Sequence, residues 1–268
     1  GDVYKRQISL CLKLCPWAKY RKNKGGIKMH TLVDLRGNLP VSVYLTSASV
    51  NDVKALDDLY IEPSAIYLMD RGYVDFNRLF KLITKKNAFF VTRAKDNMLF
   101  EVVSEAEVDK STGIISDERI KLTGLHTAKW YPEELRMVTY EDYATSKVYR
   151  FLTNNMEYEA LTISELYRER WNVELYFKWI KQHLHIKSFY GTSENAIYLQ
   201  IWIAICTYLL LAYAKKVMHI DQSLHTISKN VGLFLTDKTP LNELFNKAVP
   251  TEETEDWLYP SLFRPDDF

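Results

Sequence analysis

Four side chains that can bind a metal ion or a phosphate recur at helical spacing in the second half of the chain: Tyr167, Arg170, Glu174 and Lys181. At ~100° per residue they fall within about 60° of arc on a helical wheel, beside the apolar stripe rather than opposite it. A carboxylate next to the core, flanked by cations and a phenol, suits a site where the carboxylate binds a hard cation and the cations hold phosphates. The same spacing also fits i,i+4 charge pairs, such as Arg170–Glu174, on an exposed helix, and helix geometry alone leaves both interpretations open.

A second candidate carboxylate, Asp70, directly follows an apolar run over residues 64–69 that predicts a short buried strand. Open α/β sheets bind their ligands at the carboxyl ends of the strands, which is where this aspartate would lie. Gly72 permits a tight turn or a close backbone approach just afterwards. An aspartate at a strand end can instead cap the next turn, so Asp70 by itself does not identify a site.

The helix that carries the polar row is expected over residues 163–183. Thr162 and Glu165 give the T-x-x-E form of a capping box, which favours a helix start at this point. The chain before residue 96 alternates in the order β-β-β-α-β-α-β, which indicates a mixed sheet with helices. The strands are expected at 8–12, 27–35, 40–46, 64–69 and 88–92, and the helices over 51–59, with Asn51 as cap, and 76–84.

Between residues 97 and 154 no helical period is visible, and short β-like runs alternate with polar turns. These runs cover 99–103, 118–122, 135–140 and 147–152, which predicts a β-rich insertion. Further along, helices are expected over 194–218 and around 224–233. The nearly all-apolar stretch 197–213 is short for the ~20 residues of a membrane span, which favours a buried core helix over a membrane span or an exposed partner face.

Composition excludes several classes of protein. The 268 residues are 47% hydrophobic and 26% charged, which is typical of a folded domain and excludes a disordered chain, a collagen-like repeat and a coiled-coil rod. The formal net charge is +1, so no overall field attracts nucleic acid, although a basic cluster covers residues 19–28. Three cysteines without CxxC spacing argue against a disulfide framework and indicate a reducing, intracellular environment.

The sequence around the candidate residues resembles a known family. Tyr167, Arg170, Glu174 and Lys181 reproduce a Y-(2)-R-(3)-E-(6)-K signature, and Asp70 stands in the run Met-Asp-Arg-Gly-Tyr. Together these motifs look like those of the DDE transposases of bacterial insertion sequences that bear the YREK signature. Residues 16–30 and 191–196 also resemble that family, so the resemblance covers nearly the whole chain from residue 8 onward.

The resemblance implies an α/β fold, namely an RNase H-like mixed sheet with flanking helices, interrupted by a β-rich insertion and followed by C-terminal helices. One catalytic domain would fill residues 1–268, with its core at 8–96 and 155–235, the insertion at 97–154 and a tail at 236–268. The implied activity is metal-dependent cleavage of transposon ends followed by strand transfer, that is, phosphodiester hydrolysis and transesterification.

By the same resemblance, Asp70 and Glu174 are the second and third carboxylates of an Asp-Asp-Glu set that holds two Mg²⁺ ions, with Mn²⁺ as a substitute. Contacts to the DNA backbone would come from Tyr167, Arg170, Lys181, Lys24 and Lys28. The basic cluster that contains the last two lysines can also be only a solvated turn. The implied partners are transposon-end and target DNA and a second copy within a DNA complex, with no membrane. The implied location is the bacterial cytoplasm, at the nucleoid when DNA is bound.

The start of the chain departs from the family pattern. The first aspartate of the family should fall near Tyr4, yet the only carboxylate nearby is Asp2. Residues 1–7 look foreign to the family, there is no initiator Met, and the N-terminal DNA-recognition region is missing, so we expect a fragment of a longer protein. Two carboxylates organise a two-metal site less well than three, and we expect weak or absent catalysis. The alternatives are a nuclease without strand transfer and a non-catalytic DNA-binding remnant.

Other polar residues are weaker candidates. No zinc-ligand spacing supports metal binding by the histidines at 30, 183 and 185, so surface or packing roles are expected for them. Trp130 in the insertion could stack on a flipped base, but nothing local matches the family closely and a packed turn is favoured. Asp52 is expected to be structural.

Overall fold

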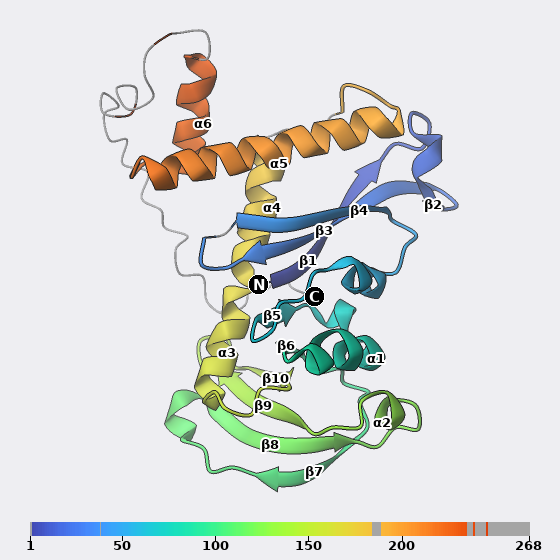
Figure 1. The fold of residues 1–268 in the computed structure, drawn as a ribbon, viewed down its shortest axis with the longest axis vertical. Coiled ribbons are helices and arrows are strands. Elements are labelled where there is room, and N and C mark those ends of the chain that lie inside the picture. Colours follow the sequence, from blue (N-terminus) through green and yellow to red (C-terminus); the bar gives the residue numbers. More distant parts are fainter. Residues whose placement is uncertain (1, 38, 184–188, 235–237, 239–244, 246–268) are drawn as a thin grey trace.

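The backbone builds one long mixed sheet with helices against it (Figure 1). The computed structural model describes residues 2–37, 39–183, 189–234, 238 and 245. Among these residues ten strands pair in the order β2-β3-β1-β5-β6-β10-β9-β8-β7, and β4 also pairs with β3. The first six strands are β1 (Asp2–Leu10), β2 (Lys19–Arg21), β3 (Lys24–Asp34), β4 (Leu39–Ser47), β5 (Ile66–Met69) and β6 (Phe89–Arg93). The next four are β7 (Phe100–Glu105), β8 (Ile114–Leu122), β9 (Leu135–Asp142) and β10 (Lys147–Thr153).

The centre of the sheet is parallel and its flanks are antiparallel. Strand β5 pairs in parallel with β1 and with β6, whereas β1–β3 and β3–β4 are antiparallel. The expected α/β class is therefore confirmed: a mixed sheet with flanking helices, four strands inserted between core elements, and helices at the C-terminal side. This arrangement is consistent with an RNase H-like core.

Strand β1 is longer than the sequence predicts and ends earlier. The expected strand covered residues 8–12, but β1 pairs with β3 over Asp2–Leu10, and Cys11 then begins a turn in which its carbonyl oxygen accepts from Cys15 at 2.8 Å. The first residues of β1 are polar and carry no apolar pattern. Their pairing with β3 holds this segment in the sheet. The close approach requires glycine, since a Cβ atom at Gly26 would lie 2.8 Å from the Ile8 carbonyl oxygen.

The β-rich insertion is present as four strands, β7 to β10, and it continues the central sheet. Strand β10 pairs with β6 in antiparallel fashion, with Leu152 opposite Thr92. Strands β9, β8 and β7 then add outward in turn. The division into core, insertion and tail remains a prediction. Of the tail, only residues 238 and 245 are among the described residues.

The short helical segments differ in type from the expectation. Residues Asp52–Asp58 form a 3₁₀ helix, and Asn51 precedes it without a side-chain capping bond, so the predicted Asn51 cap is wrong. The helix expected over 76–84 starts as α1 (Phe76–Arg78), capped by Asp75, and continues as a π turn and a 3₁₀ turn. Short α2 (Thr127–Trp130) lies in the insertion.

The long helix expected over residues 163–183 is two helices. Helix α3 (Ala160–Glu169) ends at Arg170, and α4 (Trp171–His183) follows at once. The predicted capping box is wrong, because α3 begins before Thr162, and Glu159 at the N-cap makes no side-chain bond. The two helices follow different surfaces: α3 lies along β6, β8, β9 and β10, whereas α4 meets β1 and α5 (Figure 1).

Helix α5 (Glu194–Val217) begins at Ser193, whose side chain accepts from the Ala196 N–H at 3.2 Å. It is long and apolar enough to cross a membrane, with a mean hydropathy of 1.8 in its most apolar window, but 33% of that window is buried inside the molecule. One face therefore packs as the predicted core helix does, while the other is exposed. Helix α6 (Leu224–Leu233) packs against α5.

Side chains alternate between the two faces of the sheet, and each face has its own core. On β5, Met69 packs with Tyr73 and Phe90 in the core beside α1. Leu68 points to the opposite face, where its cluster includes Ile163 and Tyr167 of α3. A further cluster on α4 joins β1 and β3 to α5. Both helices of the polar row thus lie against the sheet.

Candidate active site

Asp70 lies at the carboxyl end of β5, as the sequence predicts. Its backbone is extended (φ −65°, ψ 147°), and the 3₁₀ turn Arg71–Tyr73 follows directly. The Asp70 side chain does not cap that turn, and its carboxylate makes no hydrogen bond or ion pair with any residue that the structure describes. The capping alternative for Asp70 is therefore wrong, and the carboxylate is available to a ligand.

The direction of Asp70 follows from strand alternation. Leu68 packs in one cluster with Tyr167, and Asp70 stands two positions later with extended backbone, so it belongs to the same face of the sheet as α3. Strand β1 runs beside β5 in parallel, with Val3 opposite Met69. The next step of that register places the Cα of Tyr4 beside Asp70. The position where the sequence lacks the expected first aspartate is thus adjacent to the second one.

The junction of α3 and α4 brings together three of the four signature residues. Arg170 Nη2 lies 2.9 Å from Glu174 Oε1, and the two side chains are 15% and 24% exposed. The Arg170 guanidinium carbon also lies 5.5 Å from the centre of the Tyr167 ring, a cation–π contact. Tyr167 is itself buried against Phe151 of β10, with ring centres 4.9 Å apart. Both sequence interpretations hold in part, because the i,i+4 ion pair exists and it is half-buried beside the sheet.

Lys181 is on α4, seven residues after Glu174, and is partly exposed. Seven residues are nearly two helical turns, so Lys181 shares the side of α4 that carries Glu174. The side chain of His183 and the whole of His185 lie outside the described residues, so their expected roles stay predictions.

Two buried polar contacts, neither visible in the sequence, fix the turn that follows Asp70. His30 Nδ1 shares a hydrogen bond of 2.9 Å with the Tyr73 hydroxyl, and His30 Nε2 shares one of 3.2 Å with Thr46 Oγ1. The packing role expected for His30 is confirmed, since the residue is 3% exposed. Asp52 lies on the other side of the turn, its carboxylate 3.9 Å from where a Cβ atom of Gly72 would be.

Lys28 is engaged inside the protein. Its ammonium lies 2.8 Å from Asp52 Oδ1 and donates to the Val50 carbonyl oxygen at 2.6 Å, and the Lys28 and Asp52 side chains are only 12% and 11% exposed. This geometry argues against the predicted phosphate contact by Lys28, because its charge is already neutralised by a buried carboxylate. The structural role expected for Asp52 agrees with this ion pair.

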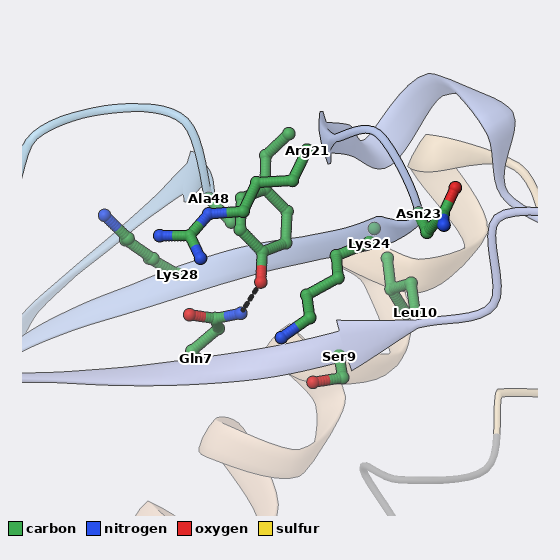
Figure 2. A pocket seen from close by; sticks show the side chains of 10 residues that line it. Gln7, Ser9, Leu10, Arg21, Asn23, Lys24, Lys28 and Ala48 are labelled. Atoms are coloured by element: carbon green, nitrogen blue, oxygen red, sulfur yellow. Dashed lines mark hydrogen bonds between the residues drawn. The ribbon is translucent and has the colours of Figure 1, made fainter.

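Lys24 and its neighbours line a polar cavity of about 660 Å³ next to β1 and β3 (Figure 2). The cavity wall includes Gln7, which donates to the Tyr20 hydroxyl at 2.7 Å, and the exposed cations Arg21 and Lys24. These two cations face each other across the β2–β3 turn, as paired residues of the two strands. Lys28 lines the same cavity, but Asp52 already neutralises its charge, so the exposed Arg21 and Lys24 are the cations of this wall that suit a phosphate.

The insertion places Trp130 at the surface. Its side chain is 44% exposed and stacks on His126, with ring centres 5.6 Å apart. Tyr131 beside it is buried and shares a hydrogen bond with Thr84 at 2.8 Å, and burial raises its pKa. Trp130 is therefore only partly packed.

Comparison with known proteins decides the family. A family model described as the transposase DDE domain matches residues 11–210. The chain belongs to the transposase DDE domain family. The matched segment includes Asp70, the whole polar row and the inserted strands.

Several relatives named as transposases agree with this assignment. The chain is 37% identical over 212 residues to y4zB of Sinorhizobium fredii, which is named as a transposase, covering 78% of this chain and 59% of that protein. It is 29% identical over 231 residues to a protein of Geobacillus stearothermophilus named for the insertion sequence element IS5377, covering 85% and 60%. A protein of Synechocystis named for the element IS4SA is 26% identical over 217 residues, covering 79% and 57%. The chain thus spans about three fifths of the length of these relatives.

The DDE family uses divalent metals, which need several ligand side chains from the protein. Asp70 and Glu174 offer oxygen ligands, which suit a hard cation such as Mg²⁺ in kind. In number they fall short: the part of the chain that the structure describes contains no group of three or more His, Cys, Asp or Glu side chains that could hold a metal ion. Asp70 and Glu174 therefore do not by themselves make up a three-carboxylate set.

Proposed function

We propose that the protein is a DNA transposase whose catalytic carboxylates include Asp70 and Glu174. The observation that carries this proposal is the position of Asp70, which ends β5 unpaired, on the sheet face against which the helix with Tyr167 packs. Helix α4, which carries Glu174, contacts β1, and β1 pairs with β5, which ends just before Asp70, so the elements that carry the two carboxylates both contact β1. Membership of the transposase DDE domain family and the names of the relatives support the same function.

Asp70 and Glu174 would hold Mg²⁺, with Mn²⁺ as a substitute. When bound, such ions activate a water or a 3′-hydroxyl and stabilise the leaving oxygen of a phosphodiester. Arg170 keeps the Glu174 carboxylate in place through their 2.9 Å ion pair, and Arg170 and Tyr167 are proposed contacts to the DNA backbone. The Tyr167 ring packs on Phe151 and makes a cation–π contact with the Arg170 guanidinium.

Phosphate contacts away from the cut are assigned to the exposed cations Arg21 and Lys24 and to the partly exposed Lys181. Lys181 extends the polar row along α4, and Lys24 with Arg21 borders the polar cavity beside β1. Such contacts position the duplex without reading its sequence, and they make binding salt-dependent.

The DNA partners are the transposon ends and a target duplex, and the setting is the bacterial cytoplasm, at the nucleoid when bound. The core at 8–96 and 155–235, the insertion at 97–154 and the tail at 236–268 are the proposed parts of one catalytic domain.

A second candidate function has one observation in its favour. Tyr4 stands beside Asp70 where a third carboxylate is expected, so this chain could bind DNA without cutting it. A nuclease without strand transfer is a further form of the same chemistry. We propose that this chain is a transposase with impaired catalysis, because Tyr4 stands where the third carboxylate is expected.

The experiment compares the chain with Tyr4→Asp and with the double variant Tyr4→Asp/Glu174→Gln. Supercoiled plasmid DNA is the substrate, with Mg²⁺, with Mn²⁺ or with EDTA, and nicked product is measured. We expect little nicking from the wild-type chain, metal-dependent nicking from Tyr4→Asp, and loss of that gain in the double variant. A DNA duplex with a free 3′-hydroxyl at a transposon end then separates strand transfer from hydrolysis.

DNA binding by each variant is measured in parallel by fluorescence anisotropy with a labelled duplex. Binding that is equal in all three variants and independent of metal, without nicking by Tyr4→Asp, would favour the non-catalytic DNA-binding protein. Robust strand transfer by the wild-type chain would instead show that position 4 needs no carboxylate.

A further inference from the structure

The polar cavity beside β1 and β3 opens on the sheet face that does not carry the candidate carboxylates. Side chains alternate along β1: Ile8 belongs to the buried cluster that includes Val173 of α4, whereas Gln7 lines the cavity. Ile8 stands four positions after Tyr4, which the strand register places beside Asp70. Ile8 and Asp70 therefore share one face of the sheet, and the cavity lies on the other.

A second set of contacts leads to the same placement. Lys28 lines the cavity, and His30, two positions later on β3, shares its 2.9 Å hydrogen bond with the Tyr73 hydroxyl. Tyr73 packs with Met69 in the core beside α1, on the face away from α3. The thickness of the sheet thus separates the cavity from the candidate carboxylates.

The wall of this cavity is positively charged. Its volume is about 660 Å³, and the described residues that line it include Arg21, Lys24 and Lys28 but no aspartate or glutamate. Asp52, outside the wall, neutralises Lys28, so the exposed Arg21 and Lys24 carry the charge that a ligand can reach. Figure 2 shows the Lys24 side chain extending within the cavity toward Gln7. The cavity is therefore suited to an anion.

The surroundings of the cavity favour a chain of phosphates over a single small anion. Guanidinium and ammonium groups form charge-assisted hydrogen bonds with phosphate oxygens, and Gln7 and Asn23 add amide groups to the wall. The positive surface also continues outside the cavity, because Lys19 and Lys22 of the same turn are exposed and do not line it. A backbone that carries many phosphates matches such an extended strip.

We propose that this cavity is a second DNA site, which holds the backbone of a DNA segment other than the one at Asp70 and Glu174. The second site rests on the proposed transposase function, because strand transfer joins two DNA segments, a transposon end and a target. DNA is stiff, with a persistence length of ~150 base pairs, so a short segment along the carboxylates does not turn round the sheet to reach Arg21 and Lys24. One chain therefore holds two segments at once, one on each face.

The first test counts, by native mass spectrometry, how many short duplexes one chain binds. The duplexes have ~10 base pairs, one helical turn, so that a single duplex does not serve both faces. The variants are Arg21→Gln/Lys24→Gln and, as a matched control, Lys19→Gln/Lys22→Gln, which removes the same charge from the same turn outside the cavity. We expect two duplexes per chain for the wild type and the control, and one for Arg21→Gln/Lys24→Gln.

Fluorescence anisotropy with the same duplexes measures the two binding steps. In Arg21→Gln/Lys24→Gln the second step should weaken about 10-fold or more, and its salt dependence should fall by about two units of slope, one for each lost phosphate contact. The first step should keep its affinity. Equal weakening of the second step by both double variants would overturn the proposal, because it would show a general effect of charge.

The second test locates the ligand on the wild-type chain, by acetylation of lysines and mass spectrometry. Lys24 reports the cavity, and Lys181 reports the face with Glu174. We expect the duplex to protect both lysines from acetylation when two duplexes are bound. Protection of Lys24 by inorganic phosphate or a deoxynucleoside monophosphate, without protection by the duplex, would overturn the proposal and assign the cavity to a small phosphate compound.

The stoichiometry distinguishes failure of the second site from failure of the proposed function. A wild-type chain that binds one duplex, with Lys24 still open to acetylation, would overturn the second site and leave the transposase function intact. A chain that binds no duplex would overturn the proposed function, and the second site with it. Equal melting temperatures of the wild type and both double variants show that the fold is kept.

Discussion

The buried ion pair between Asp117 and Arg136 should be a major determinant of stability. Arg136 of β9 donates from Nε and Nη2 to the two carboxylate oxygens of Asp117 on β8, each at 2.7 Å. The two side chains are 8% and 11% exposed. Arg136 Nη1 also donates to the carbonyl oxygens of Asn155 and Tyr158, in the loop that leads into α3. The pair thus connects the inserted strands to the helix that carries the signature tyrosine.

The variant Asp117→Ala removes the carboxylate and leaves a buried guanidinium without its counter-charge. Breaking a buried pair in this way costs about 3–5 kcal/mol. For a chain of this size each kcal/mol lowers the melting temperature by ~2–4 °C, so we expect a decrease of roughly 6–20 °C. Urea unfolding followed by circular dichroism gives the free energy, and differential scanning fluorimetry gives the melting temperature.

The matched control is Glu133→Ala, which breaks an ion pair with Lys85 of similar length, 3.0 Å, between side chains that are 49% and 58% exposed. Exposed pairs contribute ~0–1 kcal/mol, so this variant should be nearly neutral. Equal effects of Asp117→Ala and Glu133→Ala would refute the reasoning from burial. Asp117→Asn, which keeps the size of the side chain, distinguishes loss of charge from loss of packing.

Four further outcomes are expected. Tyr73→Phe should lower the free energy of unfolding by ~1–3 kcal/mol through loss of its buried hydrogen bond, whereas Tyr60→Phe, at a 77% exposed site, should not; equal urea midpoints would contradict this. Lys28→Ala should destabilise by about 3 kcal/mol because its buried carboxylate partner loses its counter-charge, and an unchanged melting temperature would argue against that pair. Lys24→Ala should leave stability unchanged and reduce the salt dependence of DNA binding by about one unit of slope, and an unaltered slope would exclude it as a phosphate contact. Burial raises the pKa of the Cys15 thiol, so iodoacetamide at mildly alkaline pH should modify the other two cysteines first, as mass spectrometry can check.

The order of elements in the core could be predicted because each follows a local pattern. Strands β3 and β4 and the strand before Asp70 have clear apolar runs, and each lies close to its expected position. The polar start of β1 could not be predicted, since its sequence carries no apolar pattern and its place in the sheet follows from backbone pairing with the distant β3. The same limit applies to the pairing of β10 with β6, which joins residues some sixty positions apart in sequence, as with Leu152 and Thr92.

The candidate site was predictable where it depended on helical spacing and not where it depended on distant partners. The ion pair between Arg170 and Glu174 follows from i,i+4 geometry, and the structure contains it. The helical wheel assumed one continuous helix, so it missed the end of α3 at Arg170, where packing changes from one group of strands to another. Lys28 looked like an available cation because its partner Asp52 is twenty-four positions away in the chain.

The change of helix at Arg170 has a consequence for how the chain can vary in length. Helix α3 is attached to the inserted strands and α4 to β1, so the junction fixes the rotation of one helix relative to the other. One extra residue inside either helix would turn everything beyond it by ~100°, and one between Arg170 and Glu174 would also carry the Glu174 carboxylate away from Arg170. The turn between β9 and β10, by contrast, can lengthen at the surface without moving either helix. Random single-codon insertion should therefore be tolerated in that turn and selected against between residues 160 and 183.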